Sequence, residues 1–293
     1  MSRGWRLVRL GGPEGERLGA VSPDGPDRIA LLPGSDPLPL LEPGALAWAA
    51  TAETLPADPA TLEPPAPYRL GLPTDCPEVW CAGVTYERSR DARVEESRSE
   101  ARDAYSLVYE AERPELFLKD AARRRTVPTR ARIGIRSDSA WNVPEPELGI
   151  VLGERGALLG VTAGNDVSSR DIEGANPLYL PQAKVYAGAC AVGPAVLVPD
   201  DWDEPFGIRL RITRDGATLF EGETSTARMK RSFRELAAFC VRDNPVPPGS
   251  VLLTGTGLVP PDEFTLERGH VVEVEVAGVG RLVNEVAKAE DLL

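Results

Sequence analysis

The chain has 293 residues, of which 42% are hydrophobic and 27% are charged, and its formal net charge at pH 7 is −12. A chain of this length can bury an ample core without stabilising crosslinks. The negative charge would repel a nucleic-acid backbone, and no stretch approaches the roughly 18 apolar residues that a membrane span requires. The N-terminus lacks the apolar stretch of a secretory signal. We therefore expect a cytoplasmic globular protein that binds neither nucleic acid nor a membrane.

The first 34 residues read as short strands, because the segments WRLVRL, RLGAV and RIALLP are separated by the turn-forming segments GGPEG and SPDGPD. Proline recurs from about residue 35 to 75, with one short helical stretch, ALAWAATAETL, between the prolines. We interpret this region as a linker. The pattern predicts a small N-terminal β domain over residues 1–75 and a catalytic domain over 76–293.

The second domain is predicted to be rich in antiparallel strands. Helical patterns occur over residues 98–112 and in the segment KRSFRELAAFCVRD, and everything else after residue 130 is strand-like. Three hairpins are predicted, and the strongest signal is the Asp215-Gly216 turn. One run, Arg123 to Arg125, is locally basic, and we interpret it as a solvated loop face or an oligomer contact. The fold class is therefore α+β and β-rich.

The segment WNVPEPELGI holds two glutamates, Glu145 and Glu147, next to Pro144 and Pro146. Proline fixes its own φ and disfavours a helical conformation at the preceding residue, so the segment is extended. Residues two apart in an extended chain face the same way, roughly 6.5 Å apart, so both carboxylates can reach one ion. Solvated acids on an edge strand would give the same short pattern.

A third carboxylate, Asp166, follows one hairpin later in GNDVSSRD. Magnesium prefers hard oxygen ligands and usually retains water molecules, so three carboxylates suit a catalytic Mg²⁺ that chelates a substrate. Mn²⁺ or Ca²⁺ are alternatives. The sequence therefore predicts a site for one divalent cation at Glu145, Glu147 and Asp166.

Several motifs occur together between residues 79 and 287: AGVTY at 82–86, EPE at 145–147, GNDVSSRDIE at 164–173, Lys184, and LLTGTG at 252–257. In this combination the chain resembles the fumarylacetoacetate hydrolase family. The resemblance implies a mixed β-roll catalytic domain and a homodimer or homotetramer. It also implies that Glu145, Glu147 and Asp166 bind the metal, that Lys184 lines the site, and that Thr256 contacts the carboxylate of a 2-keto acid substrate.

One departure bears on the reaction. Hydrolases of this family have a histidine that activates water, and Ser89 stands at the matching position. The single histidine of the chain, His270, is predicted to be a turn residue before a strand. Because hydrolysis would need another general base, we favour a different reaction.

The segments PELFLKD, RSDSAWNVPEPEL and ANPLYLPQAKVYAGAC resemble the 2-keto-3-deoxy-D-arabinonate dehydratase branch of the family, which also lacks the histidine. This implies a Mg²⁺-dependent hydro-lyase of pentose catabolism that forms 2,5-dioxopentanoate. We expect Lys184 to be the base that removes a C3 proton and Glu115 the acid that protonates the departing hydroxyl, although the two roles are exchangeable. A salt-bridge role for Lys184 and a helix-end role for Glu115 are the structural alternatives.

Weaker candidates for binding substrate hydroxyls are the polar loop residues Thr85, Ser137, Ser139 and Gln182. Such residues are usually solvated. Two other reactions use the same kind of metal site: hydrolysis of an acylpyruvate or fumarylpyruvate, and decarboxylation of oxaloacetate. The missing histidine counts against the hydrolysis.

Overall fold

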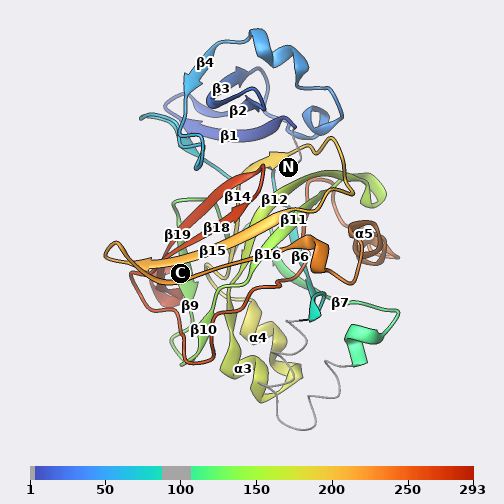
Figure 1. Cartoon of the computed structure of the whole chain (residues 1–293), viewed down its shortest axis with the longest axis vertical. Helices are drawn as coiled ribbons and strands as arrows, with labels where there is room; N and C mark the ends of the chain where they lie inside the picture. Colours follow the sequence, from blue (N-terminus) through green and yellow to red (C-terminus); the bar gives the residue numbers. More distant parts are fainter. Residues whose placement is uncertain (1–3, 88–106) are drawn as a thin grey trace.

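The computed structural model describes residues 4–87 and 107–293. Its described part contains two large β-sheets, a two-stranded sheet and a few short helices (Figure 1). A mixed, β-rich α+β architecture was predicted, and the structure has it.

The largest sheet has twelve strands. Ten of them are hydrogen-bonded in the order β4-β3-β2-β1-β14-β12-β11-β17-β6-β7, while β5 pairs with β1 and β8 pairs with β14. Their bounds are β1 (Arg6–Gly12), β2 (Gly15–Ser22), β3 (Gly25–Leu32), β4 (Thr54–Pro56), β5 (Arg69–Leu70), β6 (Glu78–Gly83), β7 (Glu115–Ala121), β8 (Thr126–Val127), β11 (Pro146–Leu152), β12 (Leu158–Asp166), β14 (Cys190–Leu197) and β17 (Val251–Leu253).

The second large sheet has five strands in the order β16-β15-β18-β19-β9. Its predicted hairpin turn is present, because Asp215 and Gly216 both have positive φ, which a two-residue turn of this type requires. The bounds are β9 (Arg132–Ile135), β15 (Gly207–Arg214), β16 (Ala217–Ser225), β18 (Val271–Val276) and β19 (Gly280–Lys288). The two-stranded sheet pairs β10 (Asn142–Val143) with β13 (Ser168–Ser169).

The main hydrophobic core lies between the two large sheets. Alternate residues of β11, Leu148, Ile150 and Leu152, pack there with Leu210 of β15 and Val274 of β18. Because side chains alternate along a strand, Glu147 and Val151 point to the opposite face of the large sheet. Val151 accordingly belongs to a second core cluster beneath the N-terminal strands. This alternation determines on which face the acidic residues lie.

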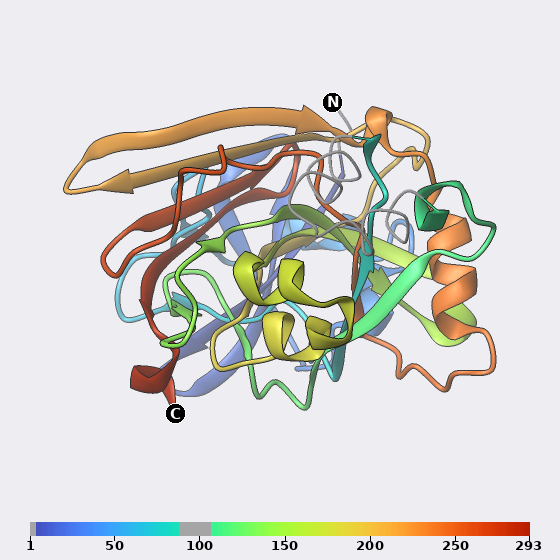
Figure 2. The same cartoon turned by 90° about the horizontal axis from the view of Figure 1, so that it is seen from below.

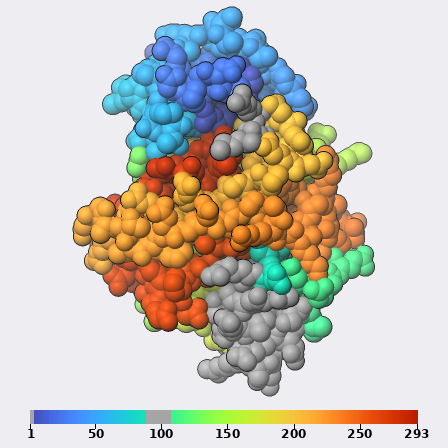
Figure 3. Space-filling view, in the orientation of Figure 1, coloured from blue at the N-terminus to red at the C-terminus, as the bar shows by residue number. Residues whose placement is uncertain are grey.

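The three strands predicted for the first 34 residues are β1, β2 and β3, and they form a lobe at one end of the molecule (Figure 3). Arg6 and Leu7 of β1 pair with Leu197 and Val196 of β14, so the N-terminal strands continue the large sheet. The division at residue 75 stays a prediction.

Helices are short and few in the described ranges. The helix predicted over residues 230–243 is α5 (Phe233–Val241), and Ser232 caps it by accepting a hydrogen bond from the Glu235 amide at 3.2 Å. The 3₁₀-helices are η1 (Leu38–Leu41), η2 (Ala47–Thr51), η3 (Glu154–Gly156), η4 (Pro177–Tyr179), η5 (Thr226–Arg228) and η6 (Ala289–Leu292). The helical stretch expected between the prolines is thus a single 3₁₀ segment, η2.

One sequence-based expectation was wrong. The region after Asp166 was expected to be strand-like, but it contains α3 (Arg170–Ala175) and α4 (Leu180–Lys184), which lie side by side at the end of the large sheet (Figure 2). Apolar and aromatic residues are dense there, and short apolar segments do not distinguish a strand from a short helix. The error matters because Lys184 is the last residue of α4.

The helix predicted over residues 98–112 is described only in part, and residues 107–110 are helical. The Arg231 guanidinium donates to the carbonyls of Glu112 at 3.0 Å and Ala111 at 2.6 Å, which satisfies acceptors where this helix ends. Ser89, which stands at the position of the family's histidine, lies outside the described residues. No helix in the described ranges has the length and apolar character needed to cross a membrane.

Candidate active site

The three predicted metal ligands lie together. Glu145 immediately precedes β11, Glu147 is the second residue of β11, and Asp166 is the last residue of β12. They are 4%, 1% and 1% exposed, respectively. One carboxylate oxygen from each lies within 4.8 Å of the other two. Buried like charges at such separations repel each other, so the group requires cationic partners.

The local backbone explains how the carboxylates meet. β11 and β12 form the predicted hairpin, with Glu147 opposite Gly164. At its open end, the Glu145 amide donates to Asn165 Oδ1 at 3.1 Å and the Asp166 amide donates to the Glu145 carbonyl at 3.0 Å. These two bonds hold Glu145 next to Asp166, and the extended conformation of the Glu-Pro-Glu segment holds Glu147 on the same side.

Lys184 supplies a cation at the centre of the group. Its ammonium nitrogen lies 2.9 Å from Glu145 Oε2, 3.0 Å from Asp166 Oδ2 and 2.6 Å from Ser168 Oγ. Lys184 is 1% exposed. Lys184 therefore forms a salt bridge with the acids, which was the structural alternative. It also lines the cavity, as the prediction of a site residue requires.

Two further buried cations contact the same carboxylates and were missed by the sequence analysis. Lys119 of β7 forms an ion pair with Asp166 and donates to the Val167 carbonyl at 2.9 Å. Arg170 of α3 lies 3.3 Å from Glu145 Oε1. Its neighbour in the sequence, Asp171, accepts a hydrogen bond from the Ser139 hydroxyl at 2.6 Å. The sequence contains a signal for Lys119. It stands two residues after Phe117 and four after Glu115 in one strand, so all three side chains lie on the same face.

The loop TGTG after β17 binds Glu147 through its backbone. Gly255 has a φ of 92° and donates its amide to Glu147 Oε2 at 2.6 Å. A side chain at Gly255 would overlap the Thr85 hydroxyl, which donates to the Thr254 carbonyl at 2.6 Å. Glycine is thus required here both by the positive φ and by the close approach of Thr85. The position of the loop was predicted, whereas the role of its backbone amide was not.

Thr256 and Glu115 line the same cavity as the carboxylates. The Thr256 hydroxyl donates to the Leu258 carbonyl at 3.0 Å. Glu115 faces Gly83 across the β6–β7 pair, and a Cβ on Gly83 would overlap the Glu115 carboxylate. The open space among these residues is about 20 Å³, enough for a single ion or water molecule.

The weaker candidates do not line this cavity. Ser137 and Gln182 are exposed, and Ser139 donates its hydroxyl to Asp171 Oδ1 at 2.6 Å. Thr85 is fully buried and supports the TGTG loop. A role for any of these four in binding substrate hydroxyls stays a prediction.

The charges around the cavity suit a divalent cation. In the described part of the chain, five carboxylates line it together with the cationic side chains of Lys184 and Arg170. Carboxylate oxygens are the ligands that Mg²⁺ prefers. Burial, followed by the charges of Asp166 and Glu145, raises the pKa of Glu147 well above its ordinary value. A bound cation would oppose this effect.

The single histidine does not line the acidic cavity. His270 is buried in the turn before β18, where its Nδ1 accepts a hydrogen bond from the Glu267 amide at 3.2 Å. Burial lowers its pKa below the ordinary value, with a smaller opposing effect of Glu267. His270 is a turn residue, as predicted.

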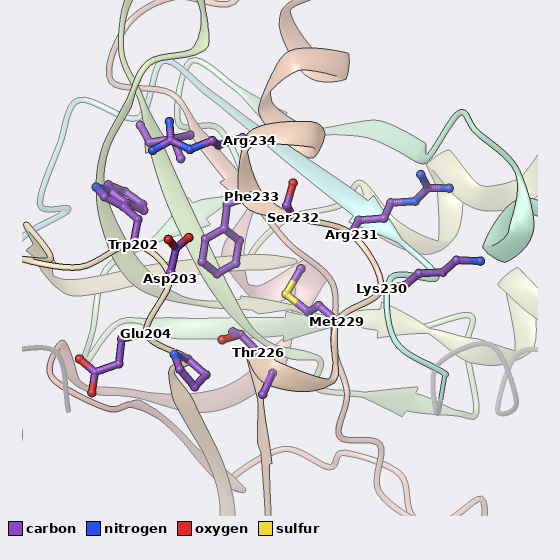
Figure 4. A pocket seen from close by; sticks show the side chains of 13 residues that line it. Trp202, Asp203, Glu204, Thr226, Met229, Lys230, Arg231, Ser232, Phe233 and Arg234 are labelled. Atoms are coloured by element: carbon purple, nitrogen blue, oxygen red, sulfur yellow. The ribbon is translucent and has the colours of Figure 1, made fainter.

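A larger cavity of about 340 Å³ lies away from the acidic group (Figure 4). Trp202, Phe233 and Met229 form its apolar wall, while the side chains of Lys230 and Arg231 point away from these three (Figure 4). None of the three predicted metal ligands lines it. The chemistry is therefore assigned to the smaller, acidic cavity.

Comparison with curated proteins reveals similar chains of about the same length. The chain is 50% identical over 217 residues, 73% of its length, to 74% of a protein from Haloferax volcanii named as a probable 2-keto-3-deoxyxylonate dehydratase. It is 43% identical over 224 residues, 75% of each chain, to the 2-dehydro-3-deoxy-D-arabinonate dehydratase of Saccharolobus solfataricus.

The fold is also that of a solved structure. A 2-keto-3-deoxy-D-arabinonate dehydratase complexed with magnesium and 2,5-dioxopentanoate superposes with a TM-score of 0.80 and 34% identity, covering 97% of this chain and 99% of the other. Residues 78–287 match the family model described as fumarylacetoacetate (FAA) hydrolase, C-terminal. With this match over more than half of its length, the chain belongs to the fumarylacetoacetate hydrolase family.

Proposed function

We propose that this protein is a Mg²⁺-dependent hydro-lyase that dehydrates a 2-keto-3-deoxy pentonate to 2,5-dioxopentanoate. The observation that carries the proposal is the buried group of Glu145, Glu147, Asp166 and Lys184 in one cavity, in a chain 43% and 50% identical to two dehydratases of such sugar acids. Glu145, Glu147 and Asp166 would hold the metal.

In the proposed site each side chain has a distinct task. Bound Mg²⁺ would supply Lewis-acid stabilisation of the negative charge that develops on the 2-keto oxygen when a C3 proton is removed. Lys184 accepts that proton at Nζ, after giving up its own, and Glu115 donates a proton to the C4 hydroxyl as it departs. Thr256 contacts the substrate carboxylate at the edge of the cavity.

The reaction loses one water molecule and needs no oxidant. Elimination leaves a C3=C4 double bond conjugated with the 2-keto group and a hydroxyl on C5. Moving a proton from C5 to C3 forms a C4=C5 enol. Protonation of C4 with loss of the enol O–H proton converts this enol to the aldehyde. Two groups that exchange protons on either side of the substrate, such as Lys184 and Glu115, suit this sequence.

The names of the two relatives, one referring to xylonate and one to D-arabinonate, describe the same compound in the D series. Arabinose and xylose differ at C2 and C3, and neither carbon is a stereocentre in a 2-keto-3-deoxy acid. The only remaining stereocentre is C4. We therefore propose 2-keto-3-deoxy-D-arabinonate, identical with the xylose-derived acid, as the substrate to assay first.

The test is a substrate panel with purified protein. 2-Keto-3-deoxy-D-arabinonate and Mg²⁺ should give 2,5-dioxopentanoate by NMR, and Glu145→Gln should abolish both the reaction and Mg²⁺ binding measured by calorimetry. Glu14→Gln, which changes an exposed glutamate far from the cavity lining, is the matched control and should keep both. Turnover of the pentonate without metal, or of acylpyruvates or oxaloacetate only, would refute the proposal.

We further propose a role in pentose catabolism, a cytoplasmic location and a homodimer or homotetramer, which rest on the family resemblance. Light scattering should give a mass of about two or four times the 31.5 kDa of the chain. A division into an N-terminal unit of residues 1–75 and a catalytic unit of 76–293 is supported by the start of the family match at residue 78.

A further inference from the structure

Another cavity, of about 530 Å³, lies where the N-terminal strands meet the loop around residues 123–131. Its lining includes four arginines, contributed by β1, by β5 and by that loop: Arg9, Arg69, Arg123 and Arg130. Only two carboxylates, Glu16 and Glu63, line it. This concentration of positive charge occurs in a chain whose net charge is −12.

Two of the four guanidinium groups are neutralised. Arg130 donates to Glu63 at 2.5 and 3.1 Å, and Arg9 donates to Glu16 at 2.9 Å and to Asp75 at 2.7 Å. Arg9 is only 6% exposed, and its Nε is buried without a hydrogen-bond partner. An unsatisfied donor of this kind is costly unless a ligand or water accepts from it.

The other two arginines carry uncompensated charge. Within the residues that the structure describes, neither Arg69 nor Arg123 has an acidic partner. Both are exposed at the cavity, one on the N-terminal strands and one on the catalytic part of the chain. Arginines from two segments that line one cavity favour an oxyanion, which guanidinium groups bind in a bidentate manner.

Glycine residues make room for this lining. Gly11 pairs with Arg69 across β1 and β5, and a Cβ on Gly11 would lie 3.3 Å from Arg69 Nε. A Cβ on Gly12 would lie 2.8 Å from the Tyr68 ring, closer than real contacts allow. The Tyr68 ring can therefore lie against β1 because residue 12 has no side chain.

We propose that this cavity is a binding site for a small, doubly charged oxyanion, a phosphorylated or dicarboxylic metabolite, separate from the acidic cavity. The anion would accept hydrogen bonds from Arg69 and Arg123, the two exposed arginines of the lining. It would link the N-terminal strands to the loop before β9. The proposal does not depend on which reaction the acidic cavity performs.

Calorimetry of the metal-free protein with inorganic phosphate tests this site, at constant ionic strength set with NaCl. Phosphate should bind with one site per chain, and Arg69→Gln and Arg123→Gln should each weaken binding about tenfold, the loss of one charge-assisted hydrogen bond. Arg155→Gln is the matched control, because Arg155 is also an exposed turn arginine with positive φ (54° against 55° for Arg123) but does not line the cavity.

A parallel titration with succinate distinguishes the two ligand classes, since tighter phosphate binding indicates a phosphorylated ligand and tighter succinate binding a dicarboxylate. Arg69 and Arg123 lie on separate segments, so a folding defect in one variant leaves the other to decide. Absence of binding by both anions would overturn the proposal. Equal weakening of anion binding by Arg155→Gln would also overturn it. If Arg123→Gln dissociates an oligomer and no anion binds, the arginines form a subunit contact instead.

Discussion

At the residue scale, the acidic cavity depends on small groups that bring charged side chains into position. Gly255 presents its amide to Glu147, and Gly83 leaves space for the Glu115 carboxylate. A side chain at Gly83 would displace the charged Glu115 carboxylate, and one at Gly255 would displace the Thr85 hydroxyl that supports the loop. Substitutions at such positions can therefore separate one proposed role from another.

Gly83→Ala should test the role of Glu115 without touching the metal ligands. The added methyl group overlaps the Glu115 carboxylate and should move it, so kcat for dehydration should fall about 100-fold, the usual contribution of a general acid. The Mg²⁺ affinity measured by calorimetry should be unchanged. Gly25→Ala, where a Cβ meets nothing within 4 Å, is the control and should keep full activity. An unchanged kcat in Gly83→Ala would remove Glu115 from the mechanism.

His270 should titrate below its ordinary pKa of 6.5, because burial disfavours the imidazolium form. The unfolded chain then binds more protons than the folded one as the pH falls through 6.5, so His270 contributes stability above that pH and loses it below. With one histidine in the chain, the NMR titration of its ring protons is unambiguous. The same titration in urea is the reference, and a folded-state midpoint at or above the unfolded one would contradict this assignment.

At the scale of elements, sequence patterns predicted structures whose signals are local. The β11–β12 hairpin places Glu145, Glu147 and Asp166 within about twenty residues of each other, so their proximity followed from one turn. Lys119 reaches Asp166 from β7, and Gly255 reaches Glu147 from the loop after β17. The alternation of Lys119 with Glu115 indicates a shared face of β7, but no local pattern shows which carboxylate that face meets. The helices α3 and α4 were missed because their apolar residues lack a long helical period.

The cap of α5 gives a quantitative test at this scale. Ser232→Ala removes the acceptor for the Glu235 amide, so the free energy of unfolding should fall by about 1 kcal/mol. Urea denaturation measures the change. Ser137→Ala, at an exposed turn position, is the control and should change the stability by less than about 0.5 kcal/mol. A loss in Ser232→Ala no larger than in the control would show that the cap is dispensable.

At the scale of the whole molecule, metal binding should increase the free energy of unfolding. Mg²⁺ that binds only the folded protein should add about 2.7 kcal/mol at 100 times its Kd, which raises the Tm by several degrees. Because the pKa of Glu147 is raised, protons compete with the metal at a higher pH than for an ordinary carboxylate. The Mg²⁺-induced rise in Tm should therefore shrink as the pH is lowered from 8 toward 5.

Differential scanning calorimetry with and without Mg²⁺ across this pH range measures the effect. Without metal, Glu147 lowers the stability as the pH rises from its pKa in the unfolded chain through its raised pKa in the folded chain. Mild acid should therefore stabilise the metal-free protein but not the metal-bound one. Glu147→Gln should remove both trends. A Tm increase by Mg²⁺ that is the same at pH 8 and pH 5 would contradict the role of Glu147 as a ligand.

The pairing of β1 with β14 also has a consequence for how the chain is made. Leu7 pairs with Val196, so this edge of β1 is completed only after about 190 further residues have been synthesised. The parallel pairs β6–β17 and β9–β19 likewise join distant parts of the chain. Such a high contact order predicts slow folding, because long loops must close before these contacts form. The N-terminal strands are therefore synthesised long before β14, the strand that completes their part of the sheet.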